Sequence, residues 1–188
     1  GVSIYVKKTI SFKVIQSFSK SVDNLYEANT IEIDQSGKKV VISCMYRKPG
    51  SNIEEFQSSI EHLVNITKYK TLYICGDFNI DLIKYNSHEP SRNFTDSLFS
   101  LGLIPLITMP TRITNTSETL IDNIFTNNLS TEHSSGILIA DVSDHLPIFT
   151  LSNENRVPKK SGKTYVFERK INNETIANLN RNLSEESW

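Results

Sequence analysis

The pattern of apolar and polar positions predicts strands and helices that alternate irregularly along the chain. Alternating residues predict a hairpin over 28–34 and 38–46, with Gln35-Ser36-Gly37 as its turn. Apolar residues at helical spacing predict one helix from Ser51 or Asn52 to about Lys68 and another from about Ser91 to Leu101. Further strands are predicted at 1–8, 71–75, 119–126, 136–141 and 146–151. This order of elements is typical of an α/β fold with two packed sheets flanked by helices.

The pattern lapses after about residue 151. Residues 153–162 are polar and have the composition of a linker, and a short strand, Thr164–Phe167, follows them. An Asn-rich helix is predicted from about Asn172 to Leu183. We therefore expect one domain at 1–151, followed by a linker and a helix at 152–188.

The composition is that of an ordinary globular chain. Hydrophobic residues make up 38% of the 188 residues, and no apolar run approaches the roughly 20 residues that span a bilayer. The net charge of −1 excludes a globally basic surface but leaves room for a local basic patch. Cys44 and Cys75 lie in apolar runs, which predicts reduced thiols in the core, and no Cys/His spacing matches a zinc site.

Two short acidic signatures lie far apart in the sequence, each next to an apolar run. Gly76-Asp77-Phe78-Asn79 directly follows a predicted strand, and Ser143-Asp144-His145 directly precedes another. Between them, Asp122 lies inside an apolar run, where a carboxylate needs a partner, and His145 is the natural candidate. Carboxylates, an amide and an imidazole brought together suit metal-assisted attack of water on a phosphodiester.

Each signature also has a simpler explanation. Asp77 and Asn79 favour turns and could only close a strand, and Ser143-Asp144-His145 could be a solvated turn. Asp122 could be exposed on an edge strand. A serine-hydrolase triad is excluded for Ser143-Asp144-His145, because such triads assemble from separated positions and the chain has no nucleophile elbow. The joint occurrence of the signatures favours the chemical interpretation.

Five short segments occur in a fixed order along the chain. They are Tyr46-Arg47-Lys48-Pro49, Gly76-Asp77-Phe78-Asn79, Pro110-Thr111-Arg112, Leu120-Ile121-Asp122 and Ser143-Asp144-His145-Leu146-Pro147-Ile148. In this order the set resembles the endonuclease/exonuclease/phosphatase superfamily, specifically the apurinic-type endonuclease domain of non-LTR retrotransposons. The resemblance covers about residues 1–151. It implies a two-sheet α/β sandwich of the DNase I type.

The resemblance also implies roles for single residues in a metal-dependent DNA endonuclease. Asp77 would align or activate the attacking water, and Asp122 would orient His145. Asn79 would bond a phosphate oxygen or steady Asp77, while Tyr46 and His145 would hold and neutralise the phosphate. Asp144 is implied as a metal-linked carboxylate, with Mg²⁺ or Mn²⁺ as the cofactor. Candidate substrate-binding residues are Ser143, Thr111, Arg112 and Arg47.

The same resemblance implies a biological setting. Double-stranded DNA would be the substrate, with no membrane partner, and the nick would prime a reverse transcriptase that is the covalent neighbour of this domain. The location would be intracellular and nuclear. In the family, a strand like residues 1–8 follows two motifs that supply an Asn and a metal-binding Glu, and both are absent here. We therefore expect a chain cut inside the domain, without its first strands and with little activity alone.

Two other functions stay open from the sequence. One is a non-catalytic nucleic-acid-binding remnant of a decayed element. The other is a superfamily phosphoesterase that acts on a substrate other than DNA.

Overall fold

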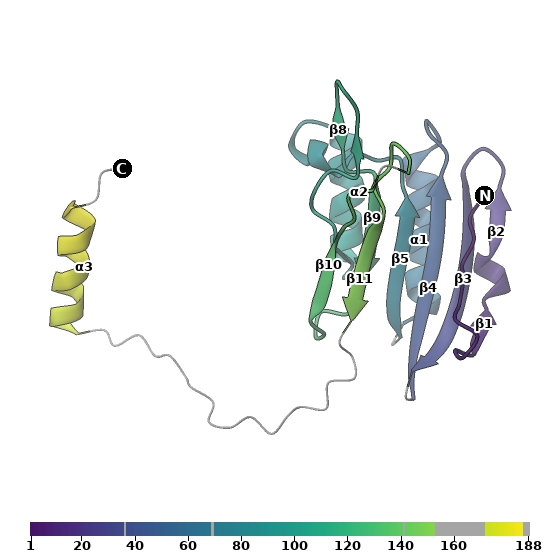
Figure 1. Ribbon diagram of the computed structural model, residues 1–188, viewed down its shortest axis with the longest axis horizontal. Coiled ribbons are helices and arrows are strands. Elements are labelled where there is room, and N and C mark those ends of the chain that lie inside the picture. Colours follow the sequence, from purple (N-terminus) through teal and green to yellow (C-terminus); the bar gives the residue numbers. More distant parts are fainter. Residues whose placement is uncertain (36, 69, 141, 153–171, 186–188) are drawn as a thin grey trace. The chain divides into compact units, whose positions relative to one another are not determined.

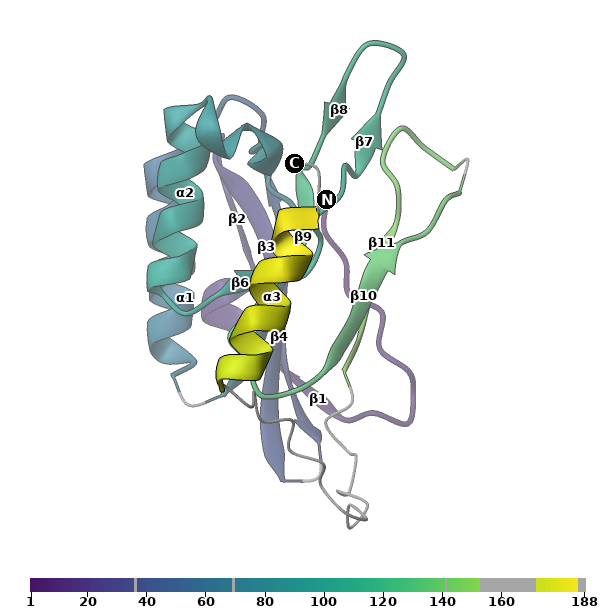
Figure 2. The same ribbon diagram turned by 90° about the vertical axis from the view of Figure 1, so that its left-hand side faces the viewer.

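The structure is a computed structural model that describes residues 1–35, 37–68, 70–140, 142–152 and 172–185. The chain divides into two compact units, residues 1–154 and 155–188. The first unit has a central sheet with two helices on one face and a small two-stranded sheet on the other (Figure 1, Figure 2).

The central sheet has seven strands in the order β1-β3-β4-β5-β9-β6, with β2 also paired to β3. Strands β4 and β5 are parallel, whereas the other neighbours in this sheet are antiparallel. The strands of this sheet are Phe12–Val14 (β1), Lys20–Val22 (β2), Tyr26–Gln35 (β3), Lys38–Arg47 (β4), Thr71–Asp77 (β5), Ile104–Pro105 (β6) and Asp122–Thr126 (β9). Two smaller sheets pair Arg112–Ile113 (β7) with Glu118–Thr119 (β8), and His133–Ile137 (β10) with Ile148–Ser152 (β11).

Two α-helices cover one face of the central sheet. Helix α1, Ile53–Ile66, is capped by Asn52, whose side-chain oxygen accepts a hydrogen bond of 3.0 Å from the backbone N–H of Glu55. Helix α2, Glu89–Ser100, ends before Gly102, which has a φ of +74°. Both helices turn aromatic residues toward the sheet, and this core contains Phe56, Phe78, Phe94 and Phe125. Short 3₁₀ helices lie at Gln16–Phe18 and Leu82–Asn86.

A second, smaller core lies on the opposite face. It is formed by Val40, Tyr73 and Ile124 of the central sheet, against which Ile148 of β11 packs. The alternation along β4 explains the two cores, because Val41 and Met45 face the helices and Val40 faces β11. The predicted fold class, a two-sheet α/β sandwich, is confirmed.

The predicted hairpin and both predicted helices are confirmed. The prediction of a strand at residues 1–8 is wrong, because no strand precedes Phe12 in the described residues. That segment is attached to β3 by the Val2 carbonyl, which accepts from the Asn29 side chain, and by the N-terminal amine, which pairs with Glu27. Such single contacts do not form the backbone ladder of a sheet.

Two later boundaries also differ from the prediction. The strand predicted at 119–126 is divided into β8 and β9, and β10 begins three residues earlier than expected. The predicted linker at 153–162 and the short strand at 164–167 fall outside the described residues. The predicted C-terminal helix is present as α3, Asn173–Glu185. Within the described residues, no helix has both the length and the apolar character to cross a membrane.

Candidate active site

A row of polar side chains crosses three neighbouring strands of the central sheet near their ends. Tyr46 of β4 lies opposite Asp77 of β5, and Asp77 lies opposite Asp122 of β9. Because register partners share a face of the sheet, these three side chains project to the side on which β10 and β11 lie. The sheet itself therefore brings together residues from three distant segments of the sequence.

Gly76 permits this row to form at the end of β5. Its φ is +143°, and a Cβ atom built at this position would lie 1.8 Å from the carbonyl oxygen of Met45 on β4. No side chain fits within that distance, so the close approach of the two strands requires glycine. The Gly-Asp pair of the first acidic signature thus has a structural cause as well as a chemical one.

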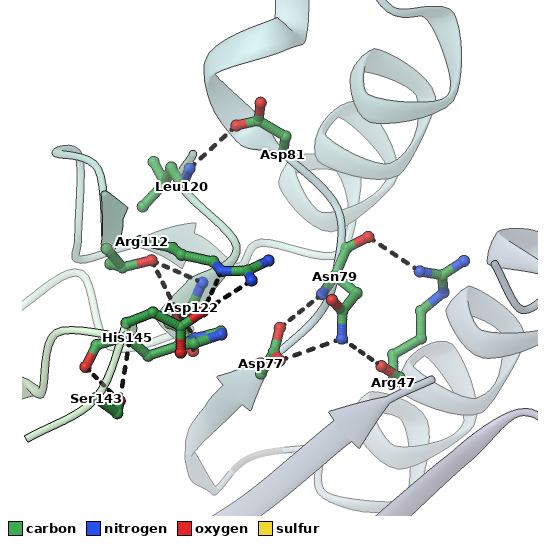
Figure 3. Close-up of polar contacts among 11 residues, drawn as sticks. Arg47, Asp77, Asn79, Asp81, Arg112, Leu120, Asp122, Ser143 and His145 are labelled. Atoms are coloured by element: carbon green, nitrogen blue, oxygen red, sulfur yellow. Dashed lines mark hydrogen bonds and ion pairs between the residues drawn. The ribbon is translucent and has the colours of Figure 1, made fainter. Parts of the chain in front are cut away.

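Asn79 closes a tight turn around the Asp77 carboxylate. Its backbone N–H donates to Oδ1 of Asp77 at 2.9 Å, and its side-chain amide donates to Oδ2 at 3.1 Å. The same amide donates to the carbonyl of Arg47 at 2.7 Å, and Asn79 has a φ of +47° (Figure 3). Of the two roles expected for Asn79, the hydrogen bonds support the one that steadies Asp77.

Arg47 has a different place from the expected one. Its side chain is only 3% exposed, and its guanidinium donates to the carbonyls of Phe78 and Asn79 at 3.3 and 3.1 Å and to the carbonyl of Ser51. A buried guanidinium is not available to a DNA backbone. The expected substrate contact is therefore corrected to a structural role, in which Arg47 fixes the turn that follows Asp77 (Figure 3).

Asp122 binds the imidazole of His145, as the sequence predicted. Nδ1 of His145 lies 2.9 and 3.1 Å from the two carboxylate oxygens of Asp122. Thr111 adds a contact on the other side, because its hydroxyl donates to Oδ2 of Asp122 at 2.7 Å and accepts from the Asp122 backbone N–H at 3.1 Å. Thr111 is 0% exposed, so it supports Asp122 rather than binding substrate as expected.

Backbone contacts hold His145 beside this pair. His145 forms an isolated β-bridge with Arg112, and the N–H of Leu146 donates to the Thr111 carbonyl at 2.7 Å. The Ser143 hydroxyl accepts from the His145 N–H and donates to its carbonyl, both at 3.0 Å. Ser143 is exposed and shapes this turn, and its expected role in substrate binding stays a prediction.

Asp77, Asp122 and His145 form one cluster, with one ligand atom from each lying within 4.8 Å of the others. They line a cavity of about 540 Å³, and residues 146–150 form another part of its wall. Burial raises the pKa of Asp77, the negative charge of Asp122 adds to this rise, and hydrogen bonds from Asn79 oppose it. A carboxylate whose pKa is raised in this way holds a proton more readily than an exposed one, which suits a group that accepts a proton during a reaction.

The donor set of this cluster fits a hard divalent cation. Asp77 and Asp122 offer carboxylate oxygens, which Mg²⁺ and Mn²⁺ prefer, and the neighbouring cavity leaves space for the waters that Mg²⁺ keeps. Burial is the main cause of the raised pKa of Asp77 and the negative charge of Asp122 adds to it, and a bound cation would stabilise both carboxylates in their charged form. Asp77 and Asp122 are therefore the residues that would hold such an ion.

Asp144 does not join the cluster. Its carboxylate is exposed and pairs with Arg112, whose Nε and NH2 atoms lie 2.8 and 2.7 Å from Oδ2. The Arg112 guanidinium lowers the pKa of Asp144. The expected role of Asp144 in metal binding and that of Arg112 in substrate binding stay predictions, and both side chains face solvent from the rim of the site.

Two residues of the cavity were not expected there. Cys44 and Cys75 are free, partly exposed thiols, as the prediction of reduced cysteines requires, and Cys75 packs against the second core; both also line the same cavity as Asp77 and His145, which the sequence did not predict. A hydrogen bond from Cys75 lowers the pKa of Cys44 to about 7, while the same interaction and burial raise the pKa of Cys75. Their spacing of two residues from Tyr46 and Asp77 was the signal that could have placed them on the site face.

Comparison with known proteins agrees with this fold. In solved structures, the endonuclease domain of TRAS1, a telomere-specific non-LTR retrotransposon, matches 80% of this chain and 72% of its own length, with a TM-score of 0.65 and 16% identity. An endonuclease/exonuclease/phosphatase family protein from Leptotrichia buccalis is similar over 66% of this chain and 53% of its own, with a TM-score of 0.48 and 18% identity. The human Nocturnin catalytic domain is similar over 74% and 60%, with a TM-score of 0.47 and 22% identity.

Comparison of sequences identifies the family of this chain. No curated protein matches the chain. The family model described as endonuclease-reverse transcriptase matches residues 40–149, which is more than half of the chain and includes Tyr46, Asp77, Asp122 and His145. This chain belongs to the endonuclease-reverse transcriptase family, within the endonuclease/exonuclease/phosphatase superfamily.

Proposed function

We propose that this protein is a divalent-metal-dependent phosphodiesterase that nicks double-stranded DNA. The observation that carries the proposal is the cluster of Asp77, Asp122 and His145, which opens into a cavity in a chain of the endonuclease-reverse transcriptase family. The resulting 3′-hydroxyl would prime synthesis by a reverse transcriptase joined to this domain. The family description and the fold shared with the TRAS1 endonuclease domain support DNA as the substrate.

The residues of the cluster divide the chemistry between them. Asp77 accepts a proton from the attacking water or holds that water in place. Asp122 holds Nδ1 of His145, so the ring keeps one orientation and presents its other nitrogen to the phosphate. Protonated His145 donates to a phosphate oxygen and offsets the negative charge that grows there.

The neighbouring residues keep these groups in place. Asn79 and, behind it, Arg47 fix the Asp77 carboxylate, and Thr111 fixes Asp122. Tyr46, beside Asp77 in the register, is the candidate for a hydroxyl contact to the phosphate. A Mg²⁺ ion bound by the carboxylates would supply charge neutralisation at the phosphate.

Nicking of supercoiled plasmid tests this proposal. The assay uses the 188-residue chain and, beside it, the protein encoded by the longest open reading frame that contains this sequence. Each is measured with Mg²⁺, with Mn²⁺ and with a chelator. We expect metal-dependent conversion to the open circle, and extension of the nick by a DNA polymerase without further processing. His145→Ala is expected to lower the rate by about 100-fold or more, the scale of a lost acid–base group.

Matched variants separate a catalytic loss from a general one. His88→Ala removes an exposed histidine at the start of α2, and Asp96→Asn removes an exposed carboxylate that bonds Tyr85. Both are expected to nick at the parental rate. Equal rates for His145→Ala and the parent, or hydrolysis of soluble phosphodiesters without any nicking by either form, would contradict the proposal.

A further inference from the structure

Two thiols lie on the site face of the sheet, one residue pair away from Tyr46 and Asp77. Cys44 of β4 is directly opposite Cys75 of β5 in the parallel register, and the next partners on this face are Tyr46 and Asp77. Both cysteines line the cavity that also contains Asp77, Asp122 and His145. Two thiols therefore lie next to Tyr46 and Asp77 on the same face of the sheet.

Both cysteines lie on the site face of the sheet. Met45, which lies between Cys44 and Tyr46 in the sequence, faces the helices and is 0% exposed. Cys44 and Cys75 face the other way and are partly exposed. Cys75 also packs against the second core, and its thiol donates to the Ser43 carbonyl at 3.6 Å. Both residues line the cavity, so a dissolved ion that enters the cavity meets this pair.

The register suits a chelate better than a disulfide. Neighbouring strands are about 4.8 Å apart, and the Cβ atoms of in-register parallel partners keep about that separation. A disulfide needs Cβ atoms about 3.8 Å apart, which would require the strands to move. Two thiolates that bind one tetrahedral ion at about 2.3 Å need a sulfur–sulfur distance of about 3.8 Å, which rotation of the side chains supplies without backbone movement.

We propose that Cys44 and Cys75 form a binding site for one thiophilic metal ion of the class of Zn²⁺, Cd²⁺ or Cu⁺. Soft thiolate ligands select these ions over Mg²⁺, which prefers the carboxylates. The sole tight cluster of potential ligands in the described residues is the Asp77 group, so no third protein ligand lies close to both thiols. The remaining positions of the ion face the cavity and take water.

Occupation of this site inhibits the enzyme. The ion lies about 7 Å from the carboxylates, since two residues of a strand span that length. It fills part of the cavity and adds positive charge beside Asp77, which weakens proton acceptance and competes with the hard cation through repulsion. Inhibition rests on the proposed phosphodiesterase function, whereas binding does not.

Cd²⁺ titration tests binding without any need for activity. Cadmium bound by thiolate has an ultraviolet charge-transfer absorption that carboxylate and imidazole ligands do not produce. The parent is expected to give this absorption with a stoichiometry of one ion per monomeric chain. Because Cys44 and Cys75 are the only cysteines, Cys44→Ser and Cys75→Ser each leave one thiol and should bind Cd²⁺ at least about tenfold more weakly.

Controls keep the result specific. Asp77→Asn and His145→Ala should retain the absorption, because they change only the oxygen and nitrogen ligands. Cys44→Ala and Cys75→Ala replace the serine variants if either serine variant loses its native circular dichroism. Undiminished affinity in single-cysteine variants, absence of the absorption in the parent, or one ion shared by two chains in size-exclusion chromatography would overturn the chelate.

Inhibition is tested separately, by measuring nicking activity. Nicking by the parent in excess Mg²⁺ is measured against increasing Cd²⁺ or Zn²⁺, beside the double variant Cys44→Ser/Cys75→Ser. We expect the double variant to need about tenfold more ion for half-inhibition. Equal sensitivity of the two proteins would overturn the inhibitory role. Charge-transfer absorption in a chain that does not nick would support the chelate and contradict only the proposed function.

Discussion

Asp77 and Asp122 lie opposite each other in the antiparallel register of β5 and β9, so two carboxylates share one side of the sheet. Like charges in directly opposed positions destabilise a sheet. Burial is the largest cause of the raised pKa of Asp77, and the charge of Asp122 contributes to it. The fold keeps this unfavourable pair through surrounding hydrogen bonds from Asn79, Thr111 and His145, and carboxylates with a shifted pKa cluster at functional sites.

Asp77→Asn should therefore increase stability while it removes activity. A group whose folded-state pKa is raised contributes its full stability at pH values below the ordinary value of 3.8, and that contribution is lost as the pH rises through the raised pKa. Asparagine does not ionise, and its Oδ1 still accepts from the Asn79 backbone N–H, so the substitution loses only the hydrogen bond from the Asn79 side chain. We expect a higher melting temperature than the parent at pH 7, a difference that shrinks toward acid, and nicking lowered by about 100-fold or more.

The control for this experiment is Asp96→Asn, which changes an exposed carboxylate on α2. Differential scanning calorimetry across the acid range should show no comparable gain for that variant. A melting temperature of Asp77→Asn at or below the parental value at pH 7 would show that burial of the Asp77 charge does not oppose folding.

Thr111→Val should reduce both stability and activity. Valine has nearly the same shape but leaves Oδ2 and the backbone N–H of Asp122 without the Thr111 hydroxyl. Loss of a buried hydrogen-bond partner costs about 1–3 kcal/mol, measured by urea unfolding. Because Asp122 then holds His145 less firmly, the pH optimum of nicking should shift in addition to a fall in rate of about tenfold.

Thr111→Ser separates positioning from packing. Serine restores the hydroxyl but not the methyl group, so we expect it to recover the parental pH profile even though it loses some stability. If Thr111→Val lowers stability and leaves the pH profile unchanged, Thr111 is only a packing residue.

Gly76→Ala should prevent stable folding of the central sheet. Its added Cβ would lie 1.8 Å from the Met45 carbonyl oxygen and 2.8 Å from the Met45 carbonyl carbon, so β4 and β5 would have to separate. Gly37→Ala is the matched control, since Gly37 also has a positive φ, +85°, but has no neighbour within 4 Å of the added atom. That control should cost only about 1 kcal/mol. Circular dichroism melts compare the two, and similar melts would contradict the steric argument.

Local patterns predicted most of the elements that position this site. The hairpin β3–β4, helices α1 and α2, and strand β5 followed from alternation, helical spacing and turn residues. The pairing of Asp122 with His145 followed from a physical requirement, because an acid in an apolar run needs a partner. The elements could be predicted because their causes are local, whereas the Asp122–His145 pair, 23 residues apart, followed only from the need of a buried acid for a partner.

Contacts between residues far apart in the sequence could not be predicted in the same way. Nothing near Arg47 in the sequence shows that its guanidinium bonds to carbonyls 31 and 32 residues away. Thr111 and Arg112 are neighbours in the sequence, but Thr111 is buried against Asp122 and the Arg112 side chain is exposed beside Asp144. The difference arises because β7 begins at Arg112, and successive side chains of an extended chain point to opposite sides. The wrong strand at residues 1–8 has the same origin, since alternation marks exposure but not the presence of a pairing partner.

Arg112 provides the sharpest test of substrate contact at the rim. Arg112→Gln should leave stability nearly unchanged, since the Arg112–Asp144 pair is exposed and such pairs contribute little. If Arg112 contacts a phosphate, DNA binding should weaken for all sequences, and the slope of log affinity against log salt should fall by about one. Asp144→Asn is the matched change: it releases Arg112 from its partner, so DNA binding measured without metal should strengthen. A mobility shift that is the same for the parent and Arg112→Gln at low and high salt would remove Arg112 from the substrate-binding residues.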